Sequence, residues 1–232
     1  MIFGAKIYQY MNNYYHERSE KMSNYFIEFE KHLMEDEKPS EYFNNLIGLG
    51  TYPKEYPFNM ISDLIKTEQN LEYHPEGSVW NHTMMVVDEA ATRKNHSENP
   101  RVFMWAALLH DIGKGPTTKI RKGKITSYDH DEVGERMARE FLEHFNEDKE
   151  FIREVTALVR WHMQILFVVK DMPWQNVEKM DEETSIEEIA LLGKCDRLGR
   201  GDMNRNTIEK EEKNVKAFLE KSKKKLSRKV KK

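Results

Sequence analysis

The chain has 232 residues, of which 38 % are hydrophobic and 33 % charged, values typical of one folded domain with a short appendage. Its 11 Phe, 10 Tyr, 4 Trp and 13 Met supply enough apolar surface to exclude a disordered chain. No apolar run approaches the roughly 18 residues of a membrane span. The N-terminus lacks the basic-then-apolar order of a secretory signal, and the single Cys195 cannot form an intrachain disulfide. We therefore expect a cytoplasmic protein with no membrane contact.

Positive charge is concentrated at the C-terminus. The last twelve residues, KSKKKLSRKVKK, hold eight Lys and Arg and no acid, which leaves 29 basic against 40 acidic residues, a net charge of −11, on the rest of the chain. Because an acidic body is a poor surface for duplex nucleic acid, this tail is the expected electrostatic contact for RNA. The simpler interpretation of the tail is a solvated, frayed helix end.

The N-terminal third is expected to be helical and then irregular. Residues 6–36 favour one or two amphipathic helices, whereas 53–77 contain three prolines and a glycine and predict an irregular stretch. Ser78 is expected to cap the next helix, which carries His82 on its apolar face.

The most apolar helix is expected at the centre of the fold. Asn99 as N-cap and Pro100 at the first helical position open the run RVFMWAALLHDI, which is apolar all round and predicts a buried helix. Gly113 and Gly115 are expected to end it.

Four further elements follow. Residues 117–127 predict a short basic hairpin or loop, solvated or steering an anion, and Asp129 is expected to cap a helix that ends at Asn146. A helix over 149–167 places His162 inward, and Thr184 or Ser185 caps a helix that carries Asp196. Residues 203–226 predict a polar surface helix. The fold class is therefore all-α, with five inward-facing helices between 78 and 199 forming a bundle.

These core helices bring polar groups to their inner faces. An unpaired inward aspartate at position 196 would cost several kcal/mol in an apolar interior unless it met a cation, and imidazoles are natural co-ligands of such a cation. Several such groups converging predict a metal site. The groups are His82, His110, Asp111, His130, His162 and Asp196.

Four separated runs match one family in order. They are LEYHPEGSVWNHTMMVVDEAA, AALLHDIGKG, YDHDEVGERMA and CDRLGR. Over about residues 53–205 the chain resembles the HD-domain metal-dependent phosphohydrolases, and most closely the HD region of bacterial multifunctional CCA-adding enzymes. The motif residues follow the family's order: a histidine, the His-Asp pair, then an aspartate.

The resemblance implies a divalent metal cofactor. Nitrogen and carboxylate ligands suit Mn, Fe, Co, Ni or Zn better than Mg. In the family pattern His130 and His162 either hold a second ion or contact the substrate phosphate and donate a proton, and the CCA-type runs favour a single ion. The implied ligands of that ion are His82, His110, Asp111 and Asp196.

The resemblance also implies catalytic and substrate-binding residues. Asp111 is expected to orient the attacking water or take its proton, with His130 and His162 as further catalytic groups. Lys114 is expected to neutralise phosphate charge, with Arg197 or Arg200 opposite it; the alternatives are an ordinary cation at a helix end for Lys114 and a surface residue for Arg200.

The implied function is a phosphomonoesterase or 2',3'-cyclic phosphodiesterase that acts on a phosphorylated small molecule, nucleotide or short RNA end. The alternatives are a deoxynucleoside triphosphate hydrolase and a non-catalytic metal-binding module that binds RNA or a protein partner. No Gly-rich loop with an Asp-x-Asp pair precedes residue 78, so tRNA tailing is not expected. The run HDIGKGPT lacks the acidic pair of alarmone hydrolases, and no Gly-Tyr-Pro segment indicates a cyclic-di-GMP phosphodiesterase.

The expected organisation has three parts. Residues 1–52 form an N-terminal helical extension, 53–205 the HD domain, and 206–232 a C-terminal helix with the basic tail.

Overall fold

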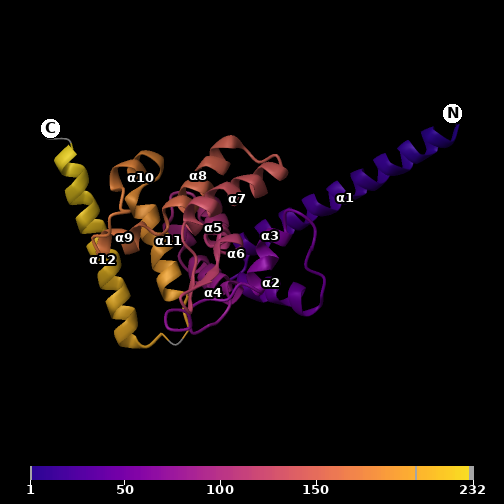
Figure 1. Cartoon of the computed structure of the whole chain (residues 1–232). Helices are drawn as coiled ribbons and strands as arrows, with labels where there is room; N and C mark the ends of the chain where they lie inside the picture. Colours follow the sequence, from indigo (N-terminus) through magenta and orange to yellow (C-terminus); the bar gives the residue numbers. More distant parts are fainter. Residues whose placement is uncertain (1, 202, 230–232) are drawn as a thin grey trace.

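The structure is a computed structural model that describes residues 2–201 and 203–229, and it confirms a mainly helical fold with one small hairpin (Figure 1). The elements are α1 (Ile2–Glu35), α2 (Pro39–Gly48), α3 (Asn59–Ser62), η1 (Asp63–Ile65), α4 (Val79–Ala91), η2 (Lys94–His96), α5 (Pro100–Leu109), α6 (Lys114–Thr117), β1 (Lys119–Arg121), β2 (Lys124–Thr126), α7 (His130–His144), α8 (Lys149–Trp161), α9 (Gln164–Val169), α10 (Val177–Glu183), α11 (Ile186–Leu198) and α12 (Arg205–Lys229). In the described part of the chain, no helix combines the length and apolarity needed to cross a membrane.

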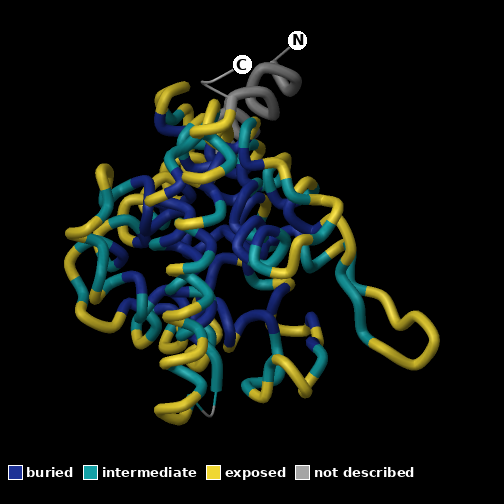
Figure 2. The backbone as a smooth tube through the Cα atoms, turned by 90° about the vertical axis from the view of Figure 1, so that its left-hand side faces the viewer, coloured by how far each residue is buried: buried dark blue, intermediate teal, exposed yellow. Residues whose placement is uncertain are grey.

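Helix α5 is the centre of the core, as its apolar sequence predicts. All its residues from Val102 to Leu109 are buried, and it packs against α1, α4, α8 and α11. The buried backbone accordingly lies in the middle of the molecule (Figure 2). The Asn99 side chain accepts from the backbone N of Val102, so the predicted N-cap is confirmed.

Two other predicted caps are also confirmed, and one is wrong. Ser78 accepts from Asn81 N at the start of α4, and Ser185, not Thr184, accepts from Glu188 N at the start of α11. Asp129 lies at the N-cap of α7 in a left-handed conformation (φ 61°), and its side chain makes no capping hydrogen bond. An N-cap residue that accepts from the following amides usually has an extended backbone, and sequence alone does not reveal the left-handed conformation found here.

Two predicted helices end earlier than expected, and a histidine follows the last residue of each. Helix α5 ends at Leu109 rather than at Gly113, and the helix expected over 149–167 is two helices, α8 and α9. His110 and His162 are the C-caps of α5 and α8, and each imidazole Nδ1 donates to the carbonyl three residues earlier. This local side-chain bond satisfies a terminal carbonyl in place of a continued helix.

The second half of α1 belongs to the main core. Phe29 and Leu33 are fully buried, and the ring of Phe26 stacks on Trp105 of α5 with centroids 4.5 Å apart. The N-terminal half of α1 extends away from the body of the molecule (Figure 1).

Helix α12 is docked and not merely a polar surface helix. Phe218 and Ser222 are fully buried, and Lys221 Nζ donates to the carbonyls of Val168 and Val169 at the end of α9. The expectation of a frayed basic tail is therefore wrong for this part of α12, because two of its lysines bind neighbouring elements: Lys225 donates to Gln175 as well. The rest of the expected tail includes 230–232, which lie outside the described residues.

The predicted hairpin is confirmed. Strands β1 and β2 pair antiparallel with Lys119 opposite Thr126, and β1 is fully exposed. The hairpin precedes α7 and forms one wall of the cavity described next.

Candidate metal centre

Six polar side chains predicted to converge do meet at the centre of the bundle. His82 comes from α4, His110 and Asp111 from the turn after α5, His130 from the first residue of α7, His162 from the turn after α8, and Asp196 from α11. We refer to these six side chains as the histidine–aspartate cluster. Five of them are buried, and the Asp196 side chain is 15 % exposed.

Three histidines of the cluster are held in the same way. His110, His130 and His162 each place Nδ1 2.7–2.8 Å from the carbonyl oxygen three residues earlier. Because Nδ1–H donates to that carbonyl, Nε2 of the neutral ring carries a lone pair. The backbone thus fixes the tautomer that a metal ligand at Nε2 requires.

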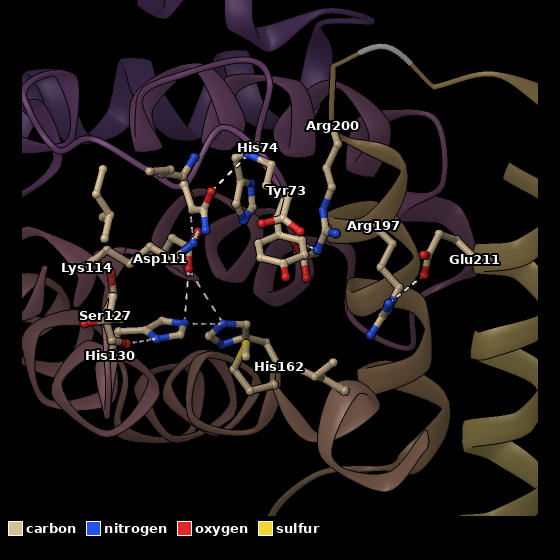
Figure 3. A pocket seen from close by; sticks show the side chains of 18 of the residues that line it. Tyr73, His74, Asp111, Lys114, Ser127, His130, His162, Arg197, Arg200 and Glu211 are labelled. Atoms are coloured by element: carbon tan, nitrogen blue, oxygen red, sulfur yellow. Dashed lines mark hydrogen bonds and ion pairs between the residues drawn. The ribbon is translucent and has the colours of Figure 1, made fainter. Parts of the chain in front are cut away.

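Asp111 lies between two pairs of histidines, one for each carboxylate oxygen. Its Oδ2 is 3.3 Å from His110 Nε2 and 3.8 Å from His82 Nε2. Its Oδ1 is 3.5 Å from His130 Nε2 and 3.7 Å from His162 Nε2 (Figure 3). One carboxylate therefore joins two groups of nitrogen ligands.

The contact between His130 and His162 calls for a cation. Their Nε2 atoms are 3.2 Å apart, and both Nδ1 atoms donate to carbonyls, so two lone pairs face each other. Burial lowers the pKa of His130 to about 4 and also lowers the pKa of His162. Neither ring is therefore protonated at neutral pH, and a shared positive ion is the natural partner of both nitrogens.

His82 and Asp196 form an ion pair on the other side of Asp111. His82 Nε2 is 3.0 Å from Asp196 Oδ1. Burial opposes the charged imidazole, but contacts with Asp196 and Glu76 outweigh it and raise the pKa of His82. Burial likewise opposes the charged carboxylate, yet the hydrogen bond from His82 and the charge of Arg200 hold the pKa of Asp196 well below its usual range. His82 and Asp196 thus face each other at hydrogen-bonding distance beside Asp111.

The donor set fits a divalent transition ion. The cluster offers four imidazole nitrogens and two carboxylates, a combination suited to Mn, Fe, Co, Ni or Zn. His110 Nε2 is buried and has no hydrogen-bond partner among the described residues. A buried nitrogen without a partner is costly unless something binds it.

Lys114 lies beside Asp111. Its Nζ is 2.6 Å from Asp111 Oδ2 and donates to Gln69 Oε1 at 2.9 Å. Although burial favours the neutral acid, the charge of Lys114 and the neighbouring His110 hold the pKa of Asp111 well below its usual range. Asp111 is therefore ionised at neutral pH.

A cavity of about 660 Å³ opens over the cluster. Its walls come from residues 69–74, the hairpin, α9, the end of α11, and α12. Lys114, Arg197 and Arg200, which the resemblance implies as substrate-binding residues, all line it. Arg200 Nη2 is 3.7 Å from Asp196 Oδ1, whereas Arg197 Nη1 turns to Glu211 of α12 at 2.6 Å (Figure 3).

Sequence reasoning missed the residues that support the cluster from the irregular stretch. Glu76 Oε1 lies 3.0 Å from His82 Nδ1, and Gln69 accepts from Lys114. The run HPEG precedes the helix of His82, but no helical periodicity in that stretch indicates which side chains face inward. Glu211 was missed because α12 was expected to lie apart on the surface.

Comparisons with known proteins agree with the resemblance noted from the motifs. A family model described as "HD domain" matches residues 79–200, just over half of the chain. The "Multifunctional CCA protein" of Actinobacillus pleuropneumoniae serotype 5b is 34 % identical over 105 residues, 45 % of this chain and 24 % of that protein. Its counterpart from Azoarcus sp. (strain BH72) is 29 % identical over 180 residues, 75 % of this chain and 42 % of that protein. The chain therefore spans less than half the length of these relatives.

Proposed function

The chain belongs to the HD-domain family, and we propose that it is a metal-dependent phosphohydrolase whose substrate phosphate binds over Asp111. The observation that carries the proposal is the histidine–aspartate cluster at the floor of a cavity lined by cations. Six buried or nearly buried polar groups, three of them imidazoles with a fixed tautomer, are costly for stability alone, and they suit a site that binds metal and phosphate.

The metal ligands follow the family pattern and the geometry. We assign His82, His110 and Asp111 to one ion together with Asp196, which lies 3.0 Å from His82 Nε2, and His130 and His162 with Asp111 to a second. The two facing lone pairs and Asp111 Oδ1, 3.5 Å from His130 Nε2 and 3.7 Å from His162 Nε2, support the second ion, so this proposal departs from the expectation of a single ion. A divalent ion bound here would polarise a phosphoryl oxygen and lower the pKa of a water for attack on phosphorus near neutral pH.

The chain's own residues supply charge and orientation. Asp111 is ionised and can orient the attacking water or accept its proton. Lys114 and Arg200 line the cavity beside the two carboxylates of the cluster, where each can neutralise a phosphate oxygen. Arg197 lines the wall formed with α12 as an ion pair with Glu211, and a substrate phosphate would compete with that carboxylate for its guanidinium.

For the substrate we propose a nucleotide or a short RNA end, cleaved as a phosphomonoester or a 2',3'-cyclic phosphodiester. Similarity to the multifunctional CCA proteins supports this class, and a cavity of about 660 Å³ leaves room for a nucleotide. Cations on the hairpin, on α11 and on α12 line that cavity although the chain is acidic outside its last twelve residues.

Product analysis of the reconstituted protein tests the proposal. Protein loaded separately with Mn²⁺, Co²⁺, Ni²⁺, Zn²⁺ or Mg²⁺ is incubated with nucleoside 2',3'-cyclic phosphates, nucleoside monophosphates and deoxynucleoside triphosphates. We expect metal-dependent release of phosphate or ring opening, reduced about 100-fold or more in Asp111→Asn. Asp129→Asn is the matched control, since Asp129 is exposed and lies outside the cluster. Triphosphate release alone would indicate a deoxynucleoside triphosphate hydrolase, and metal retention without any turnover would indicate a binding module.

A further inference from the structure

We infer that Glu76 is a positioning residue of the metal centre, whose carboxylate holds His82 through Nδ1 so that Nε2 faces Asp111 and Asp196. Glu76 lies before residue 79, where the match to the family model begins. The inference rests on the proposed function, because it assigns a supporting role toward the ligand His82.

The Glu76 carboxylate touches three different segments. Its Oε1 is 2.9 Å from His74 Nδ1 and 3.0 Å from His82 Nδ1, and its Oε2 accepts from Gly201 N at 3.1 Å. The side chain is only 4 % exposed. An acid buried to this extent, with imidazole and amide donors around it, is fixed in place rather than solvated.

This contact sets His82 apart from the other histidines of the cluster. His110, His130 and His162 each have a neutral carbonyl at Nδ1, whereas His82 Nδ1 has a carboxylate at 3.0 Å in addition to the carbonyl of Gly199 at 3.1 Å. A carboxylate behind a ligating imidazole fixes the orientation of the ring and makes its other nitrogen a stronger ligand. Glu76 therefore supports the nitrogen that faces Asp111 and Asp196.

Backbone hydrogen bonds fix the position of the segment before α4 that carries Glu76. Val79 N donates to Thr67 O at 2.9 Å and Gln69 N to Gly77 O at 3.2 Å, which closes residues 67–79 into a loop. The Gln69 side chain then joins this loop to Lys114, which contacts Asp111 Oδ2.

Two further contacts hold His82 and the Glu76 carboxylate in place. The ring of His74 packs edge-on against His82 with centroids 4.8 Å apart. The bond from Gly201 ties the carboxylate to the connection between α11 and α12. The irregular stretch is thus an outer layer of the metal centre, with Glu76 as its contact to a ligand.

Metal affinity in Glu76 variants tests the inference. We compare Glu76→Ala and Glu76→Gln with Glu68→Gln, an exposed glutamate of the same loop whose charge is removed without loss of a cluster contact. The dissociation constants for Mn²⁺ and Zn²⁺ are measured by chelator competition. We expect Glu76→Ala to weaken binding about 10- to 100-fold, Glu76→Gln to weaken it less because one oxygen acceptor remains, and Glu68→Gln to leave it unchanged.

A second readout separates positioning from mere folding. Long-range ¹H–¹⁵N spectra of the metal-free protein report the protonation of each His82 nitrogen, and Glu76→Ala should change the His82 signals while those of His130 and His162 persist. If the alanine variant fails to fold, the glutamine variant gives both measurements. Wild-type protein that binds no divalent ion would contradict the proposed function itself. Wild-type affinity together with unchanged His82 signals in a folded Glu76 variant would overturn the inference alone.

Discussion

Replacing Gly113 with alanine should disturb the metal centre without altering any of its side chains. A Cβ on Gly113 would lie 2.1 Å from the carbonyl oxygen of His130 and 2.5 Å from the backbone N of Gly134. Both contacts are with the backbone of α7, which cannot rotate away as a flexible side chain could. Since real Cβ atoms do not come within 3.0 Å of such atoms, the start of α7 must move by about 0.9 Å.

This displacement is large on the scale of metal coordination. Metal–ligand distances tolerate only about 0.2 Å, and His130 is the first residue of the helix that must move. Overpacking of this kind typically costs about 1–3 kcal/mol, and we expect the upper end because both partners are backbone atoms. We also expect binding of divalent ions to weaken at least about tenfold, equivalent to about 1.4 kcal/mol.

Urea unfolding of the metal-free protein and Mn²⁺ titration measure the two effects. Gly115→Ala is the matched control, because the nearest atom to its added Cβ is Leu64 Cδ2 at 4.0 Å. That variant should be neutral or more stable by up to about 1 kcal/mol, since alanine is the better helix former. A Gly113→Ala protein with wild-type stability and wild-type Mn²⁺ affinity would refute the reasoning from close approach.

Three further outcomes are expected. The unfolding free energy of the metal-free protein should fall by up to about 3 kcal/mol on acidification because of His130. Its imidazole takes up a proton near pH 6.5 in the unfolded chain, whereas burial lowers its pKa in the folded protein to about 4. This contribution to stability is present above pH 6.5 and is lost as the pH falls through 4. Urea unfolding should show a smaller acid loss in His130→Asn, and equal losses would contradict that cause. Ending the chain after Glu220 should lower the unfolding free energy by about 2 kcal/mol, because it removes the Lys221 hydrogen bonds and the buried Ser222. The histidine–aspartate cluster is left intact. An unchanged thermal midpoint would show that this end of α12 is not docked. Chelation should lower the thermal midpoint, and Mn²⁺ should restore it, since the ion binds only the folded state; no response to either would argue against a tightly bound ion.

Local signals predicted much of the fold. Ser78, Asn99 and Ser185 cap helices as expected, because an N-cap depends on one side chain and the next few backbone amides. The apolar face of α4 and the buried run of α5 likewise predicted that His82 and His110 point inward, and both are fully buried.

Two kinds of feature could not be predicted, local side-chain bonds that hydrophobic periodicity does not report and features that depend on tertiary contacts. Nothing in the periodicity of 149–167 indicates that the His162 side chain bonds the carbonyl of Val159 and ends α8. Glu76 lies in an irregular stretch, and its contact with His82 exists only once the loop closes. The docking of α12 on α9, α10 and α11 involves Phe218 and the partly buried Val215, Leu219 and Leu226, which are widely spaced among the many lysines of that helix, so the sequence pattern did not indicate a buried face.

The number of divalent ions bound per chain tests the central claim most directly. Elemental analysis after reconstitution with Mn²⁺ and dialysis should give two ions in the wild-type protein. His130→Ala should retain one ion, because it removes a ligand from one side of Asp111 only, and Asp111→Asn should retain fewer than His130→Ala because it removes the shared carboxylate. Folded wild-type protein that retains no ion under these conditions would contradict the assignment of a metal-dependent phosphohydrolase.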